Sequence, residues 1–294
     1  MKEFQTYNPF VILFYFMSVI FFTMFQANPL FLIISLFIAI IFNIKINGFK
    51  EAKRRVLFYL IFFCGCVLAN AIFVHEGITS LFYVNGNAIT LEALIYGMVF
   101  GCLLISIIIW FNCFSKLMSS DKIIYLFSKS VSTIGLMISM ILRFIPRFQL
   151  QLKKIISINN LNNFNKPSKN IIIKLKTVFN YFSILLTWAF ENSLDTATIM
   201  KARGYGLKNR TSFHLYKFDV RDIIVLVIII VLIIINISFY LILNLRFYYY
   251  PEIAPLIINI NYLMAYFNYI ILLGLPLIIE LKEELKWKLL ISKI

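Results

Sequence analysis

Two acidic residues, Glu191 and Asp195, stand four positions apart and are the first side chains that could do chemistry. On a helix this spacing places both carboxylates on one face, as the paired acids of a membrane-embedded lipid enzyme would require. The same pair also fits solvated or salt-bridged residues on the polar side of an amphipathic helix. The sequence favours this second interpretation and leaves the first open.

Metal and nucleotide chemistry have less support in the sequence. The two histidines, His75 and His214, fall in different predicted loops and do not form a metal-binding pair. The four cysteines lie inside apolar runs without zinc-ligand spacing, which is typical of small buried side chains. No G-x-x-x-x-G-K-[ST] pattern occurs, so the chain lacks the loop that cradles ATP phosphates in P-loop proteins. We therefore expect no metal site and no cofactor bound by this chain.

A third candidate is the run Met200-Lys201-Ala202-Arg203-Gly204-Tyr205-Gly206. Its glycines are typical helix stops, and its cations suit the negative end of a helix dipole, so a simple helix cap explains the pattern. The functional alternative is a docking arginine. An Arg between Ala and Gly lets the backbone approach a partner closely while the guanidinium donates hydrogen bonds into a groove.

Two amphipathic helices must position these residues. The first is predicted to begin near Arg147, directly after Pro146, with apolar residues at 148, 152, 155 and 156 on one face. An asparagine-rich turn and Pro167 end it. The second is predicted from about Ile171 to Arg203. It has a continuous apolar stripe formed by Leu175, Val178, Phe179, Phe182, Leu185, Leu186 and Ala189.

The composition of the remaining chain requires a membrane. Hydrophobic residues make up 61% of the 294 residues and charged residues 14%, with a mean hydropathy of +0.88. Soluble domains carry roughly half and a quarter, respectively. The predicted spans are about 9–25, 29–44, 56–74, 91–114, 223–245 and 254–279; the first two are short and could be a tight hairpin or tilted helices. A seventh run, 131–145, is more polar and is expected to pack against protein.

The chain has a net charge of +15, and most of its basic residues lie between the predicted spans. Segment 43–55 holds five Lys and Arg, segment 75–90 holds none, and segment 115–221 holds 17. The positive-inside rule therefore places 43–55, 115–221 and the C-terminus in the cytoplasm. Because spanning-length apolar runs separate the basic residues, we expect a lipid bilayer and no nucleic acid as a partner.

We predict an all-α polytopic membrane protein with two long cytoplasmic amphipathic helices. Its three segments are N-terminal membrane helices (1–120), a membrane-proximal and cytoplasmic segment (121–214) and C-terminal membrane helices (215–294). Within the fourth run, Ala93, Gly97 and Gly101 recur every four residues. Such a stripe lets two helices approach closely in lipid, either within the chain or with a membrane partner.

Residues 142–214 resemble the T component, the transmembrane coupling subunit, of energy-coupling factor (ECF) transporters. The matching segments are 142–146 (LRFIP) and 191–206 (ENSLDTATIMKARGYG). The resemblance implies that two cytoplasmic coupling helices each end in an Ala-Arg-Gly-like motif that docks on an ATPase subunit. Here the second motif is Ala202, Arg203 and Gly204. In the first, Asn162 and Asn163 stand where Arg and Gly are expected, so either these amides or the nearby cations Lys153 and Lys154 make the contact.

The resemblance also implies a non-catalytic subunit of the bacterial plasma membrane. Its expected partners are two ABC-type ATPase subunits, which would bind ATP and Mg²⁺, and a substrate-binding membrane subunit (S component). The cargo of such systems is a vitamin or a transition-metal ion, with a mild preference here for a vitamin. Two alternatives remain: a lipid-processing membrane enzyme that uses Glu191 and Asp195, and a secondary transporter that works without any ATPase.

Overall fold

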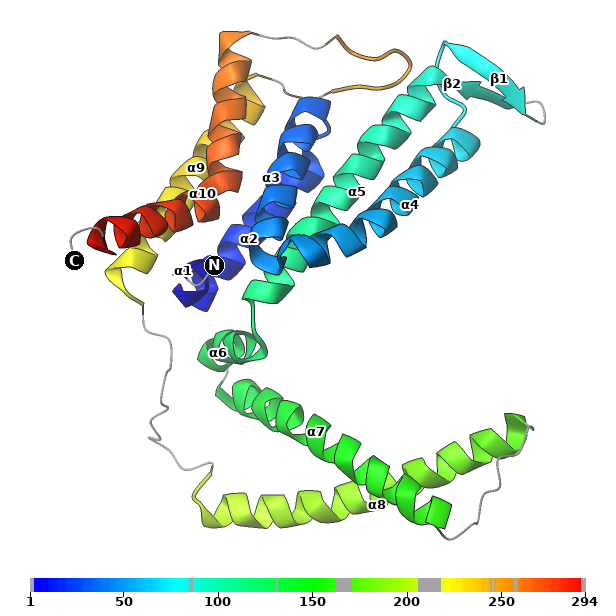
Figure 1. Ribbon diagram of the computed structural model, residues 1–294, viewed down its shortest axis with the longest axis vertical. Coiled ribbons are helices and arrows are strands. Elements are labelled where there is room, and N and C mark those ends of the chain that lie inside the picture. Colours follow the sequence, from blue (N-terminus) through cyan, green and yellow to red (C-terminus); the bar gives the residue numbers. More distant parts are fainter. Residues whose placement is uncertain are drawn as a thin grey trace. The chain divides into compact units, whose positions relative to one another are not determined.

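The computed structural model describes residues 3–84, 87–130, 132–161, 171–205, 218–243, 245, 247–255 and 259–291. The chain divides into two compact units (Figure 1). We call Met1–Ile123 together with Tyr216–Ile294 the membrane unit, because it holds the most apolar helices, and Ile124–Leu215 the hairpin unit. The predicted division into three segments stays a prediction.

The membrane unit is a bundle of helices. It contains α1 (Glu3–Thr6), α2 (Pro9–Phe25), α3 (Pro29–Asn47), α4 (Phe49–Phe73), α5 (Leu91–Leu117), the start of α6 (Ser120–Ser130), α9 (Val220–Ile242) and α10 (Ile260–Ile291). The hairpin unit contains the rest of α6, α7 (Ser132–Leu161) and α8 (Ile171–Ala202). Between α4 and α5, β1 (Ser80–Val84) pairs antiparallel with β2 (Asn87–Thr90). The sequence did not predict this small β-hairpin.

Among the residues that the structure describes, six helices are long and apolar enough to cross a membrane by length and composition, namely α3, α4, α5, α8, α9 and α10. Helix α2 is shorter, with 17 residues. The predicted all-α polytopic fold class is therefore confirmed. Helix α8 has the lowest mean hydropathy of the six, 1.3 against 1.9 to 3.2 for the others. Its predicted place outside the membrane stays a prediction.

Two predicted helix boundaries were wrong. Helix α7 begins at Ser132 and carries Pro146 inside it, so the helix does not start at Arg147. A proline removes one backbone hydrogen bond, and here the preceding apolar run already forms helical turns that continue through it. The segment 43–55 is not a loop either, because Gly48 alone joins α3 to α4, with a φ of 80°. Lys and Arg are good helix formers, so their charges mark the membrane boundary rather than a helix end.

Helix α5 packs against α2, α3 and α4. Its small residues face α4: a Cβ added at Gly97 would lie 3.1 Å from the Cα of Val67, and one added at Gly101 would lie 2.9 Å from Cδ2 of Phe63. The predicted small-residue stripe is therefore filled by a helix of the same chain. Close backbone approach of this kind is a main source of helix association in lipid, where burial from water is absent.

Aromatic side chains fill the centre of the membrane unit. Tyr15, Phe16 and Trp110 are buried there, and the rings of Phe16 and Trp110 lie 6.3 Å apart in an edge-to-face arrangement. Their polar atoms are satisfied across helices. Trp110 Nε1 donates to Ser35 Oγ at 3.1 Å, and the Tyr15 hydroxyl donates to the carbonyl oxygen of Leu273 at 2.7 Å. These bonds connect α5 to α3 and α2 to α10, which fixes the order of the bundle.

Charged side chains form contacts at one end of the membrane unit, where they join α3 to α10 and α6 to α1. Lys45 Nζ lies 3.3 Å from a carboxylate oxygen of Glu280, which is 3% exposed. Shortly after the end of α5, the ammonium group of Lys122 donates a hydrogen bond to the carbonyl oxygen of Gln5 at 2.6 Å. Burial lowers the pKa of this ammonium group. A buried ammonium group is stable only when such acceptors replace water.

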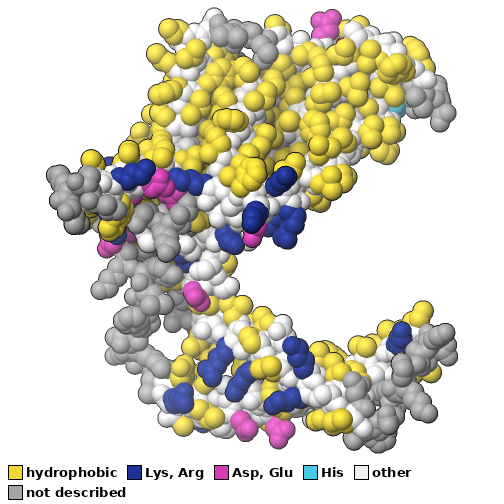
Figure 2. Space-filling view, viewed as in Figure 1, with side chains coloured by type: hydrophobic (Ala, Val, Ile, Leu, Met, Phe, Trp, Pro, Cys, Tyr) yellow, Lys and Arg dark blue, Asp and Glu magenta, His cyan; other side chains and the backbone are white. Residues whose placement is uncertain are grey.

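The basic residues of the membrane unit gather at this same end. Figure 2 shows Lys and Arg side chains along one edge of the apolar band formed by the spans. Lys45 lies in the last turn of α3, residues 50–55 lie in the first two turns of α4, and Lys116 lies in the last turn of α5. The opposite end carries the β-hairpin, and residues 74–90 include no Lys or Arg. The membrane unit thus has one basic end, and the β-hairpin segment at the other end is free of Lys and Arg.

Candidate functional site

Helix α8 ends at Ala202 in a tight backbone turn around Gly204. The N–H of Tyr205 donates to the carbonyl of Met200, and the N–H of Gly204 donates to that of Lys201, both at 3.1 Å. Gly204 has a φ of 72°, in the left-handed region that suits glycine. This pair of bonds and the left-handed residue define a Schellman motif. The prediction that glycine stops this helix at position 204 is confirmed.

The same turn displays Arg203 to solvent. Arg203 is the C-cap residue, and its side chain is exposed, as are those of Lys201 and Ala202. Ala202 offers only a methyl group and Gly204 no side chain, so neither neighbour blocks a partner that approaches the guanidinium group. Two cations at this position also interact favourably with the negative end of the α8 dipole. The geometry is compatible with a helix cap and with a docking arginine.

The corresponding end of α7 is only partly described. The helix ends at Leu161, which is 82% exposed. Asn162 and Asn163 lie outside the described residues, so their role as a degenerate motif stays a prediction. Lys153 and Lys154, the nearest cations on α7, are both exposed. They are accessible to a partner in the same way as Arg203.

Helices α7 and α8 contact each other through a few aromatic and polar side chains. The ring of Phe148 meets that of Trp188 edge-on at 5.9 Å, and Asn159 Nδ2 donates to the Tyr181 hydroxyl at 2.7 Å. Ile155, on the predicted apolar face of α7, is buried. The predicted apolar face of α7 is therefore the face that α8 covers.

Sequence reasoning missed Tyr181 and Trp188 as contact residues. The predicted apolar stripe on α8 contains aliphatic and phenylalanine residues that lie beside these two. The available signal was their spacing of seven residues, which places both aromatic rings on one face of a helix.

Most of the apolar stripe of α8 is exposed in the part of the chain that the structure describes. None of the residues of α8, all of which are described, is buried. Val178, Phe179 and Phe182 are 53% to 68% exposed, and Phe190 and Leu194 are each 69% exposed. Figure 2 shows that Lys and Arg side chains are interspersed with the apolar side chains of this unit, whereas apolar side chains dominate the spans. A large exposed apolar surface with a polar surround is typical of a protein-binding site.

The other candidate residues do not form a metal site in the part of the chain that the structure describes. Glu191 and Asp195 are both exposed on α8. His75 is exposed near the β-hairpin, where its Nδ1 lies 3.3 Å from the carbonyl oxygen of Ala88. His214 lies outside the described residues. Among the residues that the structure describes, no group of three His, Cys, Asp or Glu side chains could hold a metal ion.

The fold and the site together define a class of protein. The chain is a multi-pass α-helical membrane protein with one basic end and a separate amphipathic helical hairpin that exposes an arginine and an apolar surface. No family model matches the chain.

Several known proteins are similar in sequence. The chain is 27% identical to the energy-coupling factor transporter transmembrane protein EcfT of Staphylococcus aureus over 205 residues, which are 65% of this chain and 74% of that protein. It is 33% identical to EcfT 1 of Listeria monocytogenes over 95 residues and 31% identical to EcfT of Lactococcus lactis over 98 residues. These two shorter matches span 36% and 37% of the relatives concerned.

The chain is thus a relative of the transmembrane components of energy-coupling factor transporters. The resemblance predicted from residues 142–214 is confirmed. With its membrane-spanning helices and these bacterial relatives, it is a multi-pass protein of the bacterial plasma membrane.

Proposed function

We propose that the chain is the transmembrane coupling subunit of an ATP-driven ECF importer. In this function two ABC-type ATPase subunits bind the hairpin unit, and a substrate-binding membrane subunit binds the chain beside them. ATP and Mg²⁺ bind to the ATPases, and the chain itself is non-catalytic and binds no cofactor. The cargo is a vitamin or a transition-metal ion.

The observation that carries this proposal is the end of α8. Arg203 is exposed at a helix end whose backbone is held by two hydrogen bonds and by the left-handed Gly204. A docking arginine needs such a fixed backbone, because little conformational freedom is then lost when the guanidinium group binds carboxylate or carbonyl groups. The resemblance to the T-component motif supports the same role for Ala202, Arg203 and Gly204.

The contacts between α7 and α8 support the transmission of motion. The Phe148–Trp188 ring contact and the Asn159–Tyr181 hydrogen bond connect the two helices at points that are 11 residues apart on α7. A push on the tip of α8 by a closing ATPase would therefore move both helices. The exposed apolar stripe around Phe179 and Phe182 offers the surface through which this motion would reach the substrate-binding subunit.

The charge of the membrane unit supports the orientation. Its basic end belongs in the cytoplasm by the positive-inside rule. The segment that follows α5 leaves the membrane unit from this same end and leads into the hairpin unit. By the same rule, segment 115–221, which holds 17 Lys and Arg, belongs in the cytoplasm, where ATP is available.

The test is purification of the full chain from native bacterial membranes in mild detergent, with mass spectrometry of the proteins that accompany it. We expect P-loop ATPases to co-purify with the wild-type chain. Breaking a desolvated charged contact costs about 2–5 kcal/mol, so Arg203→Glu should weaken ATPase binding about thirtyfold or more. Lys176→Glu makes the same charge reversal at an exposed position near the start of α8 and is the matched control.

Two results would contradict the proposal. Wild-type ATPase binding by Arg203→Glu would mean that Arg203 only caps its helix, a role worth about 0.3–1 kcal/mol. Equal losses in Arg203→Glu and Lys176→Glu would mean that general charge, and not the docking motif, controls binding.

The competing enzyme hypothesis makes a different prediction from the same chain. If Glu191 and Asp195 were catalytic acids, the substitutions Glu191→Gln and Asp195→Asn would abolish activity on lipids, and no ATPase would be needed. A secondary transporter would likewise catalyse uptake in vesicles without ATP. Uptake that requires ATP and survives both substitutions would rule out these two alternatives.

A further inference from the structure

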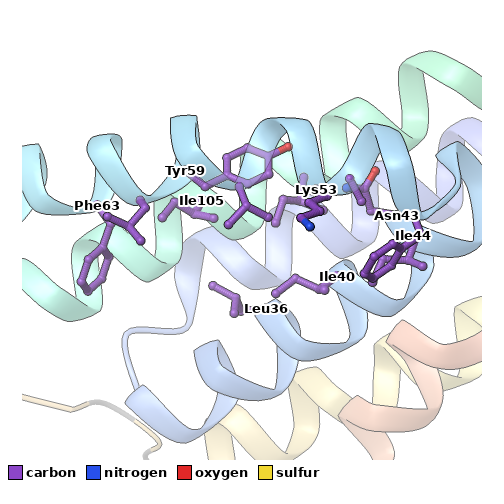
Figure 3. Close-up of a pocket in the computed structure, with 13 residues that line it drawn as sticks. Leu36, Ile40, Asn43, Ile44, Lys53, Tyr59, Phe63 and Ile105 are labelled. Carbon is purple, nitrogen blue, oxygen red and sulfur yellow. The ribbon is translucent and has the colours of Figure 1, made fainter.

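A long apolar groove lies between α3 and α4 in the membrane unit, with α5 as its floor. Its volume is about 430 Å³. Figure 3 shows Leu36 and Ile40 of α3 on one side, Tyr59 and Phe63 of α4 on the other, and Ile105 of α5 beside them. Nearly all of its lining atoms are hydrocarbon, and the groove opens to the surface of the spans. Its natural contents are therefore apolar.

The groove has the length of one leaflet of a bilayer. Its lining runs along α4 from Phe49 to Phe63, which is about 21 Å at 1.5 Å per residue. One leaflet of a bilayer is about 15 Å of hydrocarbon, or about 20–22 Å with its headgroup region. The groove therefore starts at the headgroup level at the basic end and reaches about as far as a lipid acyl chain does.

The basic end of this groove carries an ammonium group and an amide group. Asn43 and Lys53 line it there, and the ammonium group of Lys53 faces the cavity (Figure 3). The amide oxygen of Asn43 already accepts hydrogen bonds from Asn47 at 2.6 Å and from Asn112 at 3.4 Å. The amide nitrogen of Asn43 is turned toward Lys53 in Figure 3, so this end of the groove presents N–H donors to an acceptor.

The positive charge around this end of the groove favours a negatively charged ligand. Lys50, Lys53, Arg54 and Arg55 belong to the first two turns of α4, against the single acid Glu51. The other nearby cation, Lys45, is paired with glutamates of α10. An apolar groove with cations at one end matches an anionic phospholipid. Its acyl chain would lie in the groove and its phosphate would lie at Lys53. Basic pockets between spans at the cytoplasmic side bind such headgroups.

We propose that the groove between α3 and α4 is a binding site for one anionic phospholipid. The site is independent of the coupling role, because it lies within the membrane unit and involves no residue of α7 or α8. A bound lipid would fill the gap between α3 and α4, which both pack on α5. Its headgroup would neutralise part of the positive charge at the start of α4.

The test is native mass spectrometry of the delipidated full chain in detergent. Phosphatidylglycerol and phosphatidylcholine with identical acyl chains are added separately, and the bound fraction is measured against lipid concentration. We expect tighter binding of phosphatidylglycerol. Lys53→Gln should weaken phosphatidylglycerol binding about fivefold and leave phosphatidylcholine binding unchanged. Arg54→Gln removes the same charge from an exposed neighbour that does not line the groove, and should change binding less than twofold.

A second pair of variants tests the acyl-chain part of the groove. Ile40→Trp fills the groove with a larger apolar side chain and should reduce binding of both lipids. Leu57→Trp places the same side chain on α4 at a position 68% exposed and outside the groove, and should leave binding unchanged. Both positions face lipid or the groove, so neither substitution disturbs the buried aromatic centre.

Three outcomes would overturn the proposal. The first is equal binding of the two lipids by the wild-type chain. The second is equal loss in Lys53→Gln and Arg54→Gln, which would indicate attraction by general surface charge. The third is capture of a protein, rather than a phospholipid, by a photo-crosslinking residue placed at Leu60 in native membranes. That last result would identify the groove as a protein interface.

Discussion

The contact between α4 and α5 depends on the absence of a side chain at Gly97, which makes Gly97→Leu an informative substitution. A Cβ at this position would lie 3.1 Å from the Cβ of Asn70 and from the Cα of Val67, and 3.3 Å from the Val67 carbonyl oxygen. Two of these three atoms are backbone and cannot rotate away. A leucine side chain would therefore force α4 away from α5.

The expected cost follows from this geometry. Overpacking of a tightly packed site costs about 1–3 kcal/mol. Separation of the helices would also stretch the hydrogen bond from Asn70 Nδ2 to the carbonyl oxygen of Ala93, now 2.5 Å long, which contributes about 0.5–1.5 kcal/mol. Replacing a helical glycine gains about 1 kcal/mol in helix propensity. This gain also occurs at Gly65 on α4, where an added Cβ would meet no atom within 4 Å.

The difference between Gly97→Leu and Gly65→Leu therefore isolates the packing term. The assay is unfolding of each purified variant in mixed detergent micelles by added sodium dodecyl sulfate. Gly97→Leu should have a free energy of unfolding about 1.5–4.5 kcal/mol below that of Gly65→Leu, because overpacking and the lost hydrogen bond add. Equal unfolding free energies for the two variants would refute the inference that α4 fills the small-residue stripe of α5.

Two further predictions concern the ends of the membrane unit. In intact cells, Tyr83→Cys on β1 should react with an impermeant maleimide, whereas Lys50→Cys should react only after permeabilisation; the opposite pattern would reverse the orientation. Glu280→Gln should reduce stability more than Glu284→Gln, because Glu280 is 3% exposed and Glu284 is 56% exposed in their shared ion pairs with Lys45. An exposed ion pair contributes about 0–1 kcal/mol, so an equal loss in the two variants, measured by the same unfolding assay, would contradict this ranking.

Local features of the chain were predictable because contiguous residues encode them. The apolar runs predicted the spans, and the second amphipathic helix was predicted from about Ile171 to Arg203, where the structure has Ile171–Ala202. Gly204 signalled its own left-handed turn. The β-hairpin was missed because its strands, with five and four residues, are too short for a clear alternation. Pro146 was misplaced because a proline can either occupy the first turn of a helix or kink the interior of a long one.

The candidate site was predictable in part. The sequence by itself located Ala202, Arg203 and Gly204 at a helix end, because turn chemistry depends on neighbouring residues. It could not tell that Trp188 and Tyr181 hold α8 against α7, since contacts between residues 22 and 40 positions apart depend on how the helices cross. The role of Asn162 and Asn163 stays a prediction.

By itself the sequence determined that the protein is a helical membrane protein with one basic side, because hydrophobicity and charge are properties of the residue types and their order. Only the tertiary structure decided what each helix face meets. From the sequence, the small-residue stripe at Gly97 could pack against a partner or against the same chain, and the structure shows that α4 packs on it. The groove between α3 and α4 exists because both helices pack on α5 and leave a gap between them. Such gaps depend on the distances between helices, which no local pattern of residues specifies.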